Sequence, residues 1–289
     1  MTGAGAFACA AATDTGLVRE VNEDRYWVDA ERGVFLVVDG IGGHADGARA
    51  AQTAVETIRA TVFGEGTAEQ RVRHAIAAAN NRIFELAHGS GMACVLTLAV
   101  VEANTVTIGH VGDSRLYLIW NGAIRKLTSD HSPVGEDEDA GQLTEIEAML
   151  HPRRHEIFRD VGSRPHQPGD GDFIEIRQCP FRADAALLLT SDGLTDHLTS
   201  AQVREIVDRY DGDSQTVVRA LVEAANAAGG RDNTTVLFVA GPEFRGHAGV
   251  TRPRFGTTRV RRRTGIFTSR AAFLVYGLAL AMLLWVVLR

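Results

Sequence analysis

The chain has 289 residues, of which 45% are hydrophobic and 23% charged, as is typical of a globular protein with enough apolar material for a core. Its three cysteines, Cys9, Cys94 and Cys179, lie far apart and indicate neither a disulfide framework nor a zinc site. The net charge of −6 divides into +8 for the segment from Gly246 onward and −14 for the residues before it. An acidic body argues against nucleic-acid binding and favours divalent cations as partners, whereas a basic tail favours a membrane surface.

The N-terminal part of the chain is predicted to alternate short strands with loops. Residues 7–12 enter a first strand, and residues 26–28 resume another. The loop between them places Arg19 close to Glu23 and Asp24. Such a charged loop is usually a solvated segment, but it also fits a site that binds a charged ligand.

An apolar run, Val34–Val38, ends in Asp39 and a glycine-rich turn. Five consecutive apolar residues suit a strand that is covered on both faces. A carboxylate at the end of such a strand needs water, a cation or hydrogen-bond donors, because burying it without a partner is costly. Helical spacing of apolar residues follows over 45–63, so the unit consists of a strand, an acidic corner, a glycine turn and a helix.

Two interpretations of this unit compete. Gly40, Gly42 and Ala45 fit the loose dinucleotide-binding pattern, in which a helix N-terminus receives a pyrophosphate. Alternatively, Asp39 is a metal ligand and the glycines expose a backbone carbonyl beside it. The nucleotide interpretation requires a second parallel strand soon after the helix, but the sequence predicts a second helix over 67–88. The rest of the chain must decide between them.

The middle of the chain repeats the motif of an acid that interrupts an apolar strand. Residues 95–101 and 105–111 are rich in β-branched residues and predict a hairpin. Asp113 follows the second strand, and the apolar run 116–120 then leads to an Asn-Gly hairpin turn. The polar region from about 135 to 168 has short helical patches and no core-forming period, so it is predicted to be a surface excursion and not a domain.

The same arrangement returns in the last third of the body. The apolar strand 185–190 ends in Asp192 and a glycine, and Asp232 precedes a strand over 234–239. Between them the pattern predicts two helices, and Ser200 is a plausible cap for the first. The helices are expected over 199–210 and 214–228.

The C-terminal part has a different composition. We expect the folded domain to occupy residues 1–242, followed by a basic linker over 243–270. Residues 271–288 carry no charge, and as a helix they would span roughly 27 Å, close to the hydrocarbon thickness of a bilayer. The alternative is a buried core helix, which suits an extreme terminus behind a basic linker less well. Seven arginines precede the span and one follows, so the positive-inside rule predicts a single-pass anchor at the inner or plasma membrane with the body in the cytoplasm.

Acidic residues that close apolar strands are the candidate chemical groups. Any one of them could be a structural turn aspartate. Strand ends on one edge of a layered sheet converge, however, so together they predict an oxygen-rich, strongly negative pocket that requires cations. Such ligands select Mg²⁺ or Mn²⁺, and Arg19 is a natural clamp for phosphate oxygens, which indicates a phosphate-ester hydrolase. The acids are Asp39, Asp113, Asp192 and Asp232, with Glu23 and Asp24 as an addition.

Six motifs follow one another in a defined order. They are Arg19-x-x-Asn22-Glu23-Asp24, Val38-Asp39-Gly40-x-Gly42-Gly43-His44, His110-Val-Gly112-Asp113-Ser114-Arg115-x-Tyr117, Leu127-Thr128-x-Asp130-His131-Ser132, Ser191-Asp192-Gly193-Leu194 and Gly230-x-Asp232-Asn233-x-Thr235. In this order they resemble the signature series of the metal-dependent serine/threonine phosphatases of the protein phosphatase 2C family, in its bacterial form. The resemblance covers about residues 7–240.

The resemblance implies an α+β fold, a four-layer α/β/β/α sandwich with a two-metal centre of Mn²⁺ or Mg²⁺ at one end of its sheets. It implies that the metal-bridged hydroxide attacks phosphoserine or phosphothreonine, that Arg19 holds the phosphate, and that residues 135–168 form a flap that influences substrate choice. The implied partners are phosphorylated proteins and a Ser/Thr kinase. The implied metal ligands are Asp39 as the bridge, the Gly40 carbonyl, Asp192 and Asp232, with Glu23 and Asp24 direct or through water, and Asp113 with Asp192 for a weaker third ion.

The chain departs from the family pattern in three places. Ile41 stands where many eukaryotic members have a histidine, so the acid that protonates the leaving group is unassigned, with His44 as a candidate that could equally be a loop histidine. Met92–Val95 replaces a Gly-Thr-Thr segment, and 161–163 matches loosely. A rival hypothesis is an inactive pseudophosphatase that serves as a membrane-bound binding module. The retention of every acidic position argues against it.

Overall fold

A computed structural model describes residues 7–42 and 45–247 of the chain. The strands are β1 (Ala8–Asp14), β2 (Arg25–Asp29), β3 (Val34–Ile41), β4 (Ala93–Glu102), β5 (Thr105–Val111), β6 (Arg115–Trp120), β7 (Ala123–Lys126), β8 (Glu175–Pro180), β9 (Ala186–Thr190) and β10 (Thr234–Ala240). The helices are α1 (Ala45–Thr61), α2 (Ala68–Ala87), α3 (Pro133–Asp139), α4 (Glu145–Met149), α5 (Asp192–Thr195), α6 (Ser200–Val207) and α7 (Ser214–Ala227).

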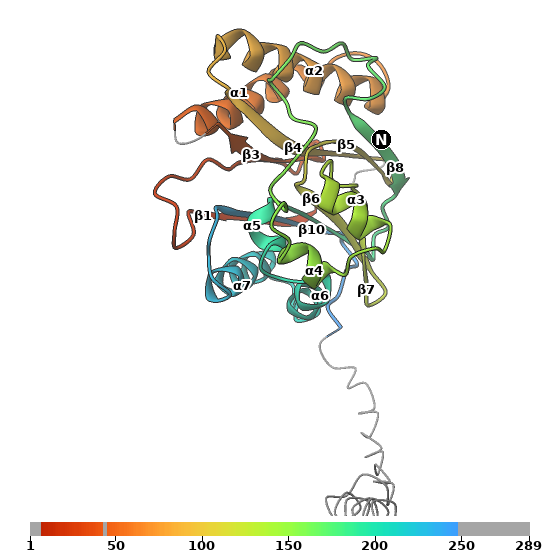
Figure 1. The fold of residues 1–289 in the computed structure, drawn as a ribbon. Coiled ribbons are helices and arrows are strands. Elements are labelled where there is room, and N and C mark those ends of the chain that lie inside the picture. Colours follow the sequence, from red (N-terminus) through yellow and green to blue (C-terminus); the bar gives the residue numbers. More distant parts are fainter. Residues whose placement is uncertain (1–6, 43–44, 248–289) are drawn as a thin grey trace, which may run out of the picture. The chain divides into compact units, whose positions relative to one another are not determined.

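The strands form two five-stranded antiparallel sheets stacked face to face. One sheet has the order β1-β10-β9-β6-β7 and the other the order β2-β3-β4-β5-β8. Helices α1 and α2 cover the outer face of the second sheet, and α6 and α7 cover the outer face of the first (Figure 1). The predicted α/β/β/α sandwich is therefore confirmed.

Alternating side chains of single strands explain why the central strands are apolar throughout. In β3, Val34, Leu36 and Val38 face the helices, whereas Phe35 and Val37 face the other sheet. Successive side chains of a strand point to opposite faces, so a strand between two covered faces must be apolar at every position. One apolar core lies between the two sheets, and one lies between each sheet and its helices. These cores fix the register of the strands, and this register brings the polar strand ends together.

Helix boundaries follow local capping chemistry. Thr67 caps α2 in a reciprocal capping box with Gln70, and Thr199 caps α6 in the same way with Gln202. The prediction that Ser200 caps α6 is therefore wrong by one residue. The Thr199 hydroxyl accepts the backbone N–H of Gln202, the third helical residue, and the Gln202 side chain accepts the backbone N–H of Thr199. These two hydrogen bonds stabilise the start of the helix at this position.

Strand β8 was missing from the sequence prediction. Its side chains are exposed or half-buried, and it pairs on one side only, with β5. An edge strand of this kind needs no continuous apolar run, so it leaves a weak signal in the sequence. The other predicted strands are confirmed, with ends that differ by at most three residues, the largest difference being the end of β3 at Ile41 in place of Val38.

The proposed anchor and most of the linker, residues 271–288 and 243–270, lie outside the described residues. Within residues 7–42 and 45–247, no helix is both long and apolar enough to cross a membrane. The boundaries proposed for these segments stay predictions.

Candidate active site

The acidic residues of the sequence motifs gather at one end of the two sheets. The register brings this about: Asp39 lies in β3 opposite Val95 of β4, and Arg25, directly after Asp24, pairs with Val38. In the other sheet, Thr190 pairs with both Arg115 and Val236, so the loops that carry Asp113, Asp192 and Asp232 leave neighbouring strand ends. Residues from five separate parts of the chain therefore meet at one edge.

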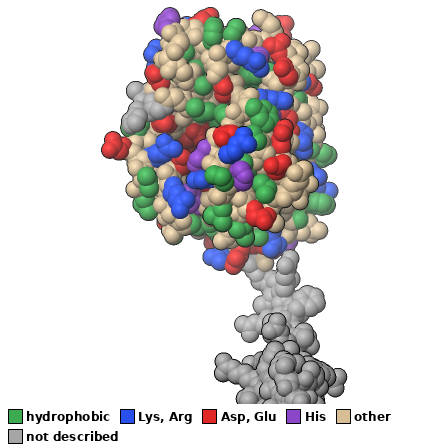
Figure 2. Space-filling view, in the orientation of Figure 1, with side chains coloured by type: hydrophobic (Ala, Val, Ile, Leu, Met, Phe, Trp, Pro, Cys, Tyr) green, Lys and Arg blue, Asp and Glu red, His purple; other side chains and the backbone are tan. Residues whose placement is uncertain are grey.

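A cavity of about 230 Å³ occupies this edge. Figure 2 shows acidic side chains gathered in the middle of the displayed face, with arginine and histidine side chains beside them. Seven of the eight predicted site residues line the cavity: Arg19, Glu23, Asp39, Gly40, Asp113, Asp192 and Asp232. The convergence inferred from the strand ends is thus present in the structure.

Asp24 is the predicted site residue that does not line the cavity. It is buried, and the hydroxyl of Ser191 donates a 2.7 Å hydrogen bond to its Oδ2. In the described part of the chain its Oδ1 has no hydrogen-bond partner. A buried carboxylate oxygen without a donor is costly, so Asp24 is suited to act on a cation from behind the cavity.

The carboxylates raise one another's pKa. Burial, followed by the charges of Asp24 and Asp192, raises the pKa of Asp39 well above its ordinary value. Burial and the charge of Asp192 do the same for Asp113. Burial raises the pKa of Asp24 to about 7, against the lowering effect of the Ser191 hydrogen bond. Cations that replace the protons would stabilise this cluster, because their charge offsets the repulsion among the carboxylates. The donors are carboxylate oxygens, which fit Mg²⁺ or Mn²⁺.

Arg19 stands at the rim and is held by one of the acids. Its Nη2 donates a 2.7 Å hydrogen bond to Asp232 Oδ2, and half of its side chain is exposed. Partial burial lowers the pKa of Arg19, but the hydrogen bond and charge of Asp232 outweigh it, so the net shift is upward. The guanidinium thus stays charged and retains free donors toward the cavity.

Asn233 supports the loop that carries Arg19 and Glu23. Its Oδ1 accepts the backbone N–H of Glu23 at 2.8 Å, and its Nδ2 donates to the carbonyls of Thr15 and Val21. Asn233 belongs to the last of the six sequence motifs, but no role was predicted for it. Its position directly after Asp232 is the signal that could have assigned it to the site.

Gly40 is required by close packing. A Cβ at this position would lie 2.2 Å from the carbonyl oxygen of Gly47 in α1 and 2.9 Å from the carbonyl oxygen of Glu23. Any side chain would therefore push α1 and the Glu23 loop away from the end of β3. The sequence predicted a glycine here because its backbone must come close to a ligand. The contact with α1 and the Glu23 loop is a second reason why this position requires glycine.

The flap, residues 135–168, contains α4 and most of α3 and is tied to the body at several points. Arg115 of β6 lies 2.6 Å from Asp130 Oδ2 and 2.7 Å from Glu138 of α3, and all three side chains are largely buried. At its other end, Val161 forms a two-way backbone bridge with Cys94 of β4. Met92–Val95, which departs from the family pattern, is buried and well paired there.

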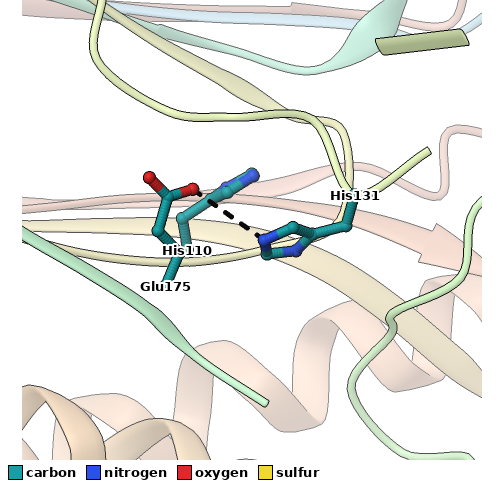
Figure 3. Close-up of side chains that lie close together, drawn as sticks. All are labelled: His110, His131 and Glu175. Carbon is teal, nitrogen blue, oxygen red and sulfur yellow. Dashed lines mark ion pairs between the residues drawn. The ribbon is translucent and has the colours of Figure 1, made fainter. Parts of the chain in front are cut away.

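His110 and His131 form a buried pair beside Glu175 (Figure 3). Gly112 N–H donates to His131 Nδ1 at 2.9 Å, and the Gly112 carbonyl accepts from the His131 backbone at 2.7 Å. The His131 carbonyl in turn accepts the backbone N–H of Phe158 in the flap. The His131 ring also lies 3.8 Å from Glu175 of β8, and the two side chains point toward each other.

The ring nitrogens of His110 are already used within the protein. The Ser129 carbonyl can only accept, so His110 Nε2 donates to it at 3.1 Å, and Nδ1 then accepts from Thr97. Burial lowers the pKa of His110 and lowers that of His131 to about 3, so both rings are neutral. Hydrogen bonds to Ser129 and Gly112 therefore hold His110 and His131 in place, and Glu175 accepts the Ser129 backbone N–H at 3.0 Å, so the three side chains are not a free set of metal ligands.

Two further residues belong to the site although the sequence did not indicate them. His155 of the flap lines the cavity beside Asp192, and Asp196 lies next to both. Asp196 stands four residues after Asp192, one helical turn on, which is a usable signal. His155 has no such signal, because only the folded flap brings it there.

The acid that protonates the leaving group stays unassigned. Ile41, at the position where many eukaryotic members have a histidine, lines the cavity and can supply no proton. His44 lies outside the described residues, so its role stays a prediction.

A four-layer sandwich that collects carboxylates at one end of its two sheets is the architecture of the metal-dependent protein phosphatases. The chain belongs to the protein phosphatase 2C family, since that family's model matches residues 18–227. This membership confirms the family inferred from the six motifs.

Known relatives agree with this assignment. The chain is 33% identical to the serine/threonine phosphatase stp of Listeria welshimeri over 241 residues, which cover 78% of this chain and 93% of the relative. It is 35% identical to the protein phosphatase PhpP of Streptococcus pneumoniae over 240 residues, with 79% and 95% covered. Among solved structures, the catalytic domain of the serine threonine protein phosphatase PstP in complex with two manganese ions is similar with a TM-score of 0.70 and 28% identity, and 81% of this chain and 97% of that one are covered.

Proposed function

We propose that the protein is a serine/threonine phosphatase that hydrolyses phosphoserine and phosphothreonine in proteins with Mn²⁺ or Mg²⁺ as cofactor. The observation that carries this proposal is the cavity at the sheet ends, which joins a set of mutually repelling carboxylates to one exposed guanidinium. The names of the relatives and the two manganese ions of the PstP structure support it.

The chain's own residues suit two tasks, cation binding and phosphate binding. Asp39 and the Gly40 carbonyl, with Asp192 and Asp232, would hold the cations. Glu23 and Asp24 would act directly or through water, and Asp113 with Asp192 would serve a weaker third ion. When bound, such ions activate water and screen the phosphoryl charge. Arg19 would orient the phosphate, and its bond to Asp232 keeps the guanidinium at the rim before substrate arrives.

The activity is tested with the full-length chain and a phosphothreonine peptide. Hydrolysis should require added Mn²⁺ and stop when EDTA removes it, because the carboxylates of the cavity would act by holding the ions that activate water. Release of inorganic phosphate is the measurement. If the metal-loaded chain binds the peptide but releases no phosphate, the protein is an inactive pseudophosphatase and the proposal is wrong.

The same assay tests the role of Arg19. Arg19→Ala should raise KM by about 10-fold or more, since a charge-assisted bond to phosphate is worth roughly 1.5–3 kcal/mol. Arg209→Ala is a matched control, because Arg209 is exposed and lies in the helix cap region of α6, outside the cavity lining. An unchanged kcat/KM for Arg19→Ala would remove this residue from the phosphate site.

We also propose that residues 271–288 tether the phosphatase domain to a membrane. The domain would lie in the cytoplasm and reverse phosphorylation by a Ser/Thr kinase. The support is the sequence alone: an uncharged stretch of 18 residues behind an arginine-rich linker. Deleting residues 271–289 should move the protein from the membrane fraction to the soluble fraction after cell lysis. If the truncated chain stays with the membranes, another attachment is responsible.

A further inference from the structure

The loop between β1 and β2, which carries Arg19, also exposes apolar side chains. Leu17 and Val18 directly precede Arg19 in this loop. Both the loop and the flap border the cavity, since Arg19 and Ile157 belong to its lining. Within the described residues, the four most exposed large hydrophobic side chains all lie in these two segments and are between 61% and 76% exposed: Leu17, Val18, Ile146 and Leu150. An apolar surface of this kind beside a cavity indicates a binding surface.

Hydrogen bonds fix the backbone of the loop in this conformation. The Leu17 N–H donates to the Gly230 carbonyl at 2.7 Å. Nδ2 of Asn233 donates to the carbonyls of Thr15 and Val21, on either side of Leu17 and Val18. Because these bonds hold the loop along its length, its apolar side chains stay in water until a partner covers them.

The position of Arg19 identifies that partner. A phosphate bound by Arg19 is attached to a residue of the substrate chain, and the residues one and two positions away lie within roughly 7 Å of it when the chain is extended. These neighbours pass over the loop that holds Arg19, and Leu17 and Val18 belong to the same short loop. The apolar surface is therefore continuous with the proposed phosphate site, and the segment that carries the phosphate covers both.

We propose that Leu17, Val18 and Val21 form a subsite for an apolar side chain of the substrate. The preferred substrates are then protein segments in which an aliphatic or aromatic residue stands within about two positions of the phosphorylated Ser or Thr. This inference rests on the proposed function and narrows its substrate class. Contact between the two apolar surfaces removes both from water, which favours such segments, whereas a charged neighbour would lose hydration without gaining a partner.

The flap supplies a further apolar side chain close to the cavity. Phe158 directly follows Ile157 of the cavity lining and is 46% exposed. Its backbone N–H donates to the His131 carbonyl at 2.9 Å, and its ring centroid lies 6.1 Å from that of His131. These contacts hold Phe158 in place while almost half of it stays accessible. A substrate segment that leaves the cavity along the flap thus also meets an apolar side chain.

The test uses the full-length chain with Mn²⁺ and two phosphothreonine peptides that differ only beside the phosphothreonine, where one has leucine and the other serine. We expect kcat/KM to be about 10-fold higher for the leucine peptide, because part of a leucine side chain leaves water. In the double variant Leu17→Ser and Val18→Ser, this ratio should fall by about 5-fold or more. Phe84→Ser is the matched control, because Phe84 is an exposed apolar residue of α2 outside the cavity lining, and it should keep the ratio.

The outcomes separate this inference from the proposed function. If the unmodified chain hydrolyses both peptides equally well, or if the double variant keeps the preference for leucine, the apolar subsite is wrong while the phosphatase activity stands. A membrane surface or a second copy of the chain then covers the loop. If neither peptide releases phosphate in the presence of Mn²⁺, the proposed function itself fails.

Discussion

Asp39→Asn is expected to lower kcat/KM by about 10³-fold or more and at the same time to stabilise the metal-free chain. Asp39 lines the cavity, and neighbouring carboxylates raise its pKa. Metal ions contribute several kcal/mol to transition-state stabilisation, and each 1.36 kcal/mol changes a rate tenfold. An uncharged amide would hold a divalent ion less well than a carboxylate, so most of that contribution should be lost.

The second half of this prediction distinguishes lost function from lost structure. Asparagine has nearly the shape of aspartate but no charge, so it removes repulsion with Asp24 and Asp192 in the metal-free state. The melting temperature in EDTA should therefore rise. Asp172→Asn, at an exposed position outside the cavity, should change neither quantity. Activity within tenfold of the unmodified chain would exclude Asp39 as a central ligand.

The metal-free chain should lose stability as the pH rises from about 6.5 to 8. A carboxyl group whose pKa is raised in the folded state contributes stability below its ordinary pKa, and this contribution disappears as the pH rises through the folded value. The pKa of Asp24 is about 7, and burial places those of Asp39 and Asp113 well above their ordinary values. Each carboxyl that stays protonated in this window lowers the unfolding free energy by about 1.4 kcal/mol per pH unit.

The window avoids groups that act in the opposite direction. Burial lowers the pKa values of His110 and His131. These two residues therefore affect the pH dependence of stability only at pH values below about 6.5, where the histidines of the unfolded chain bind protons. Arg115 and Lys126 lower the pKa of Asp130 against its burial, and its effect falls at still lower pH. Urea unfolding in EDTA at several pH values measures the slope.

Added Mn²⁺ should remove most of this pH dependence. When the free Mn²⁺ concentration is about 100 times the dissociation constant of a site, binding at that site adds about 2.7 kcal/mol to the unfolding free energy. The bound ion also keeps the carboxylates ionised. Asp24→Asn should flatten the slope without metal, whereas Asp172→Asn should leave it unchanged. A metal-free chain that is equally stable at both pH values would show that these carboxylates are not strongly coupled in solution.

The sequence predicted the sheets and the acidic corner because both depend on local patterns. Strands buried on two faces, such as β3, carry continuous apolar runs, and a carboxylate at the end of such a run is visible without any tertiary information. The register of neighbouring strands then brings these ends together. The ordered motifs supplied the family, and with it the expected role of each acid.

Other parts of the site could not be read from the sequence because they depend on tertiary contacts. His155 reaches Asp192 only through the folded flap, and Ser191 meets Asp24 across 167 positions of the chain. The edge strand β8 lacks the apolar run that marks the central strands. The cap of α6 was misplaced by one residue because Thr199 and Ser200 are chemically similar candidates, and the helical geometry selects between them.

The pairing of β1 with β10 sets the order in which this protein can become active during synthesis. Ala8 pairs with Ala240, and Asn226 near the end of α7 donates to Asp14, so the first strand finds its partner only after almost the whole domain has left the ribosome. Asp232 arrives with the same last strand. A nascent or truncated chain therefore carries Arg19 and Asp39 but no complete site, and dephosphorylation cannot begin before translation of the domain is finished.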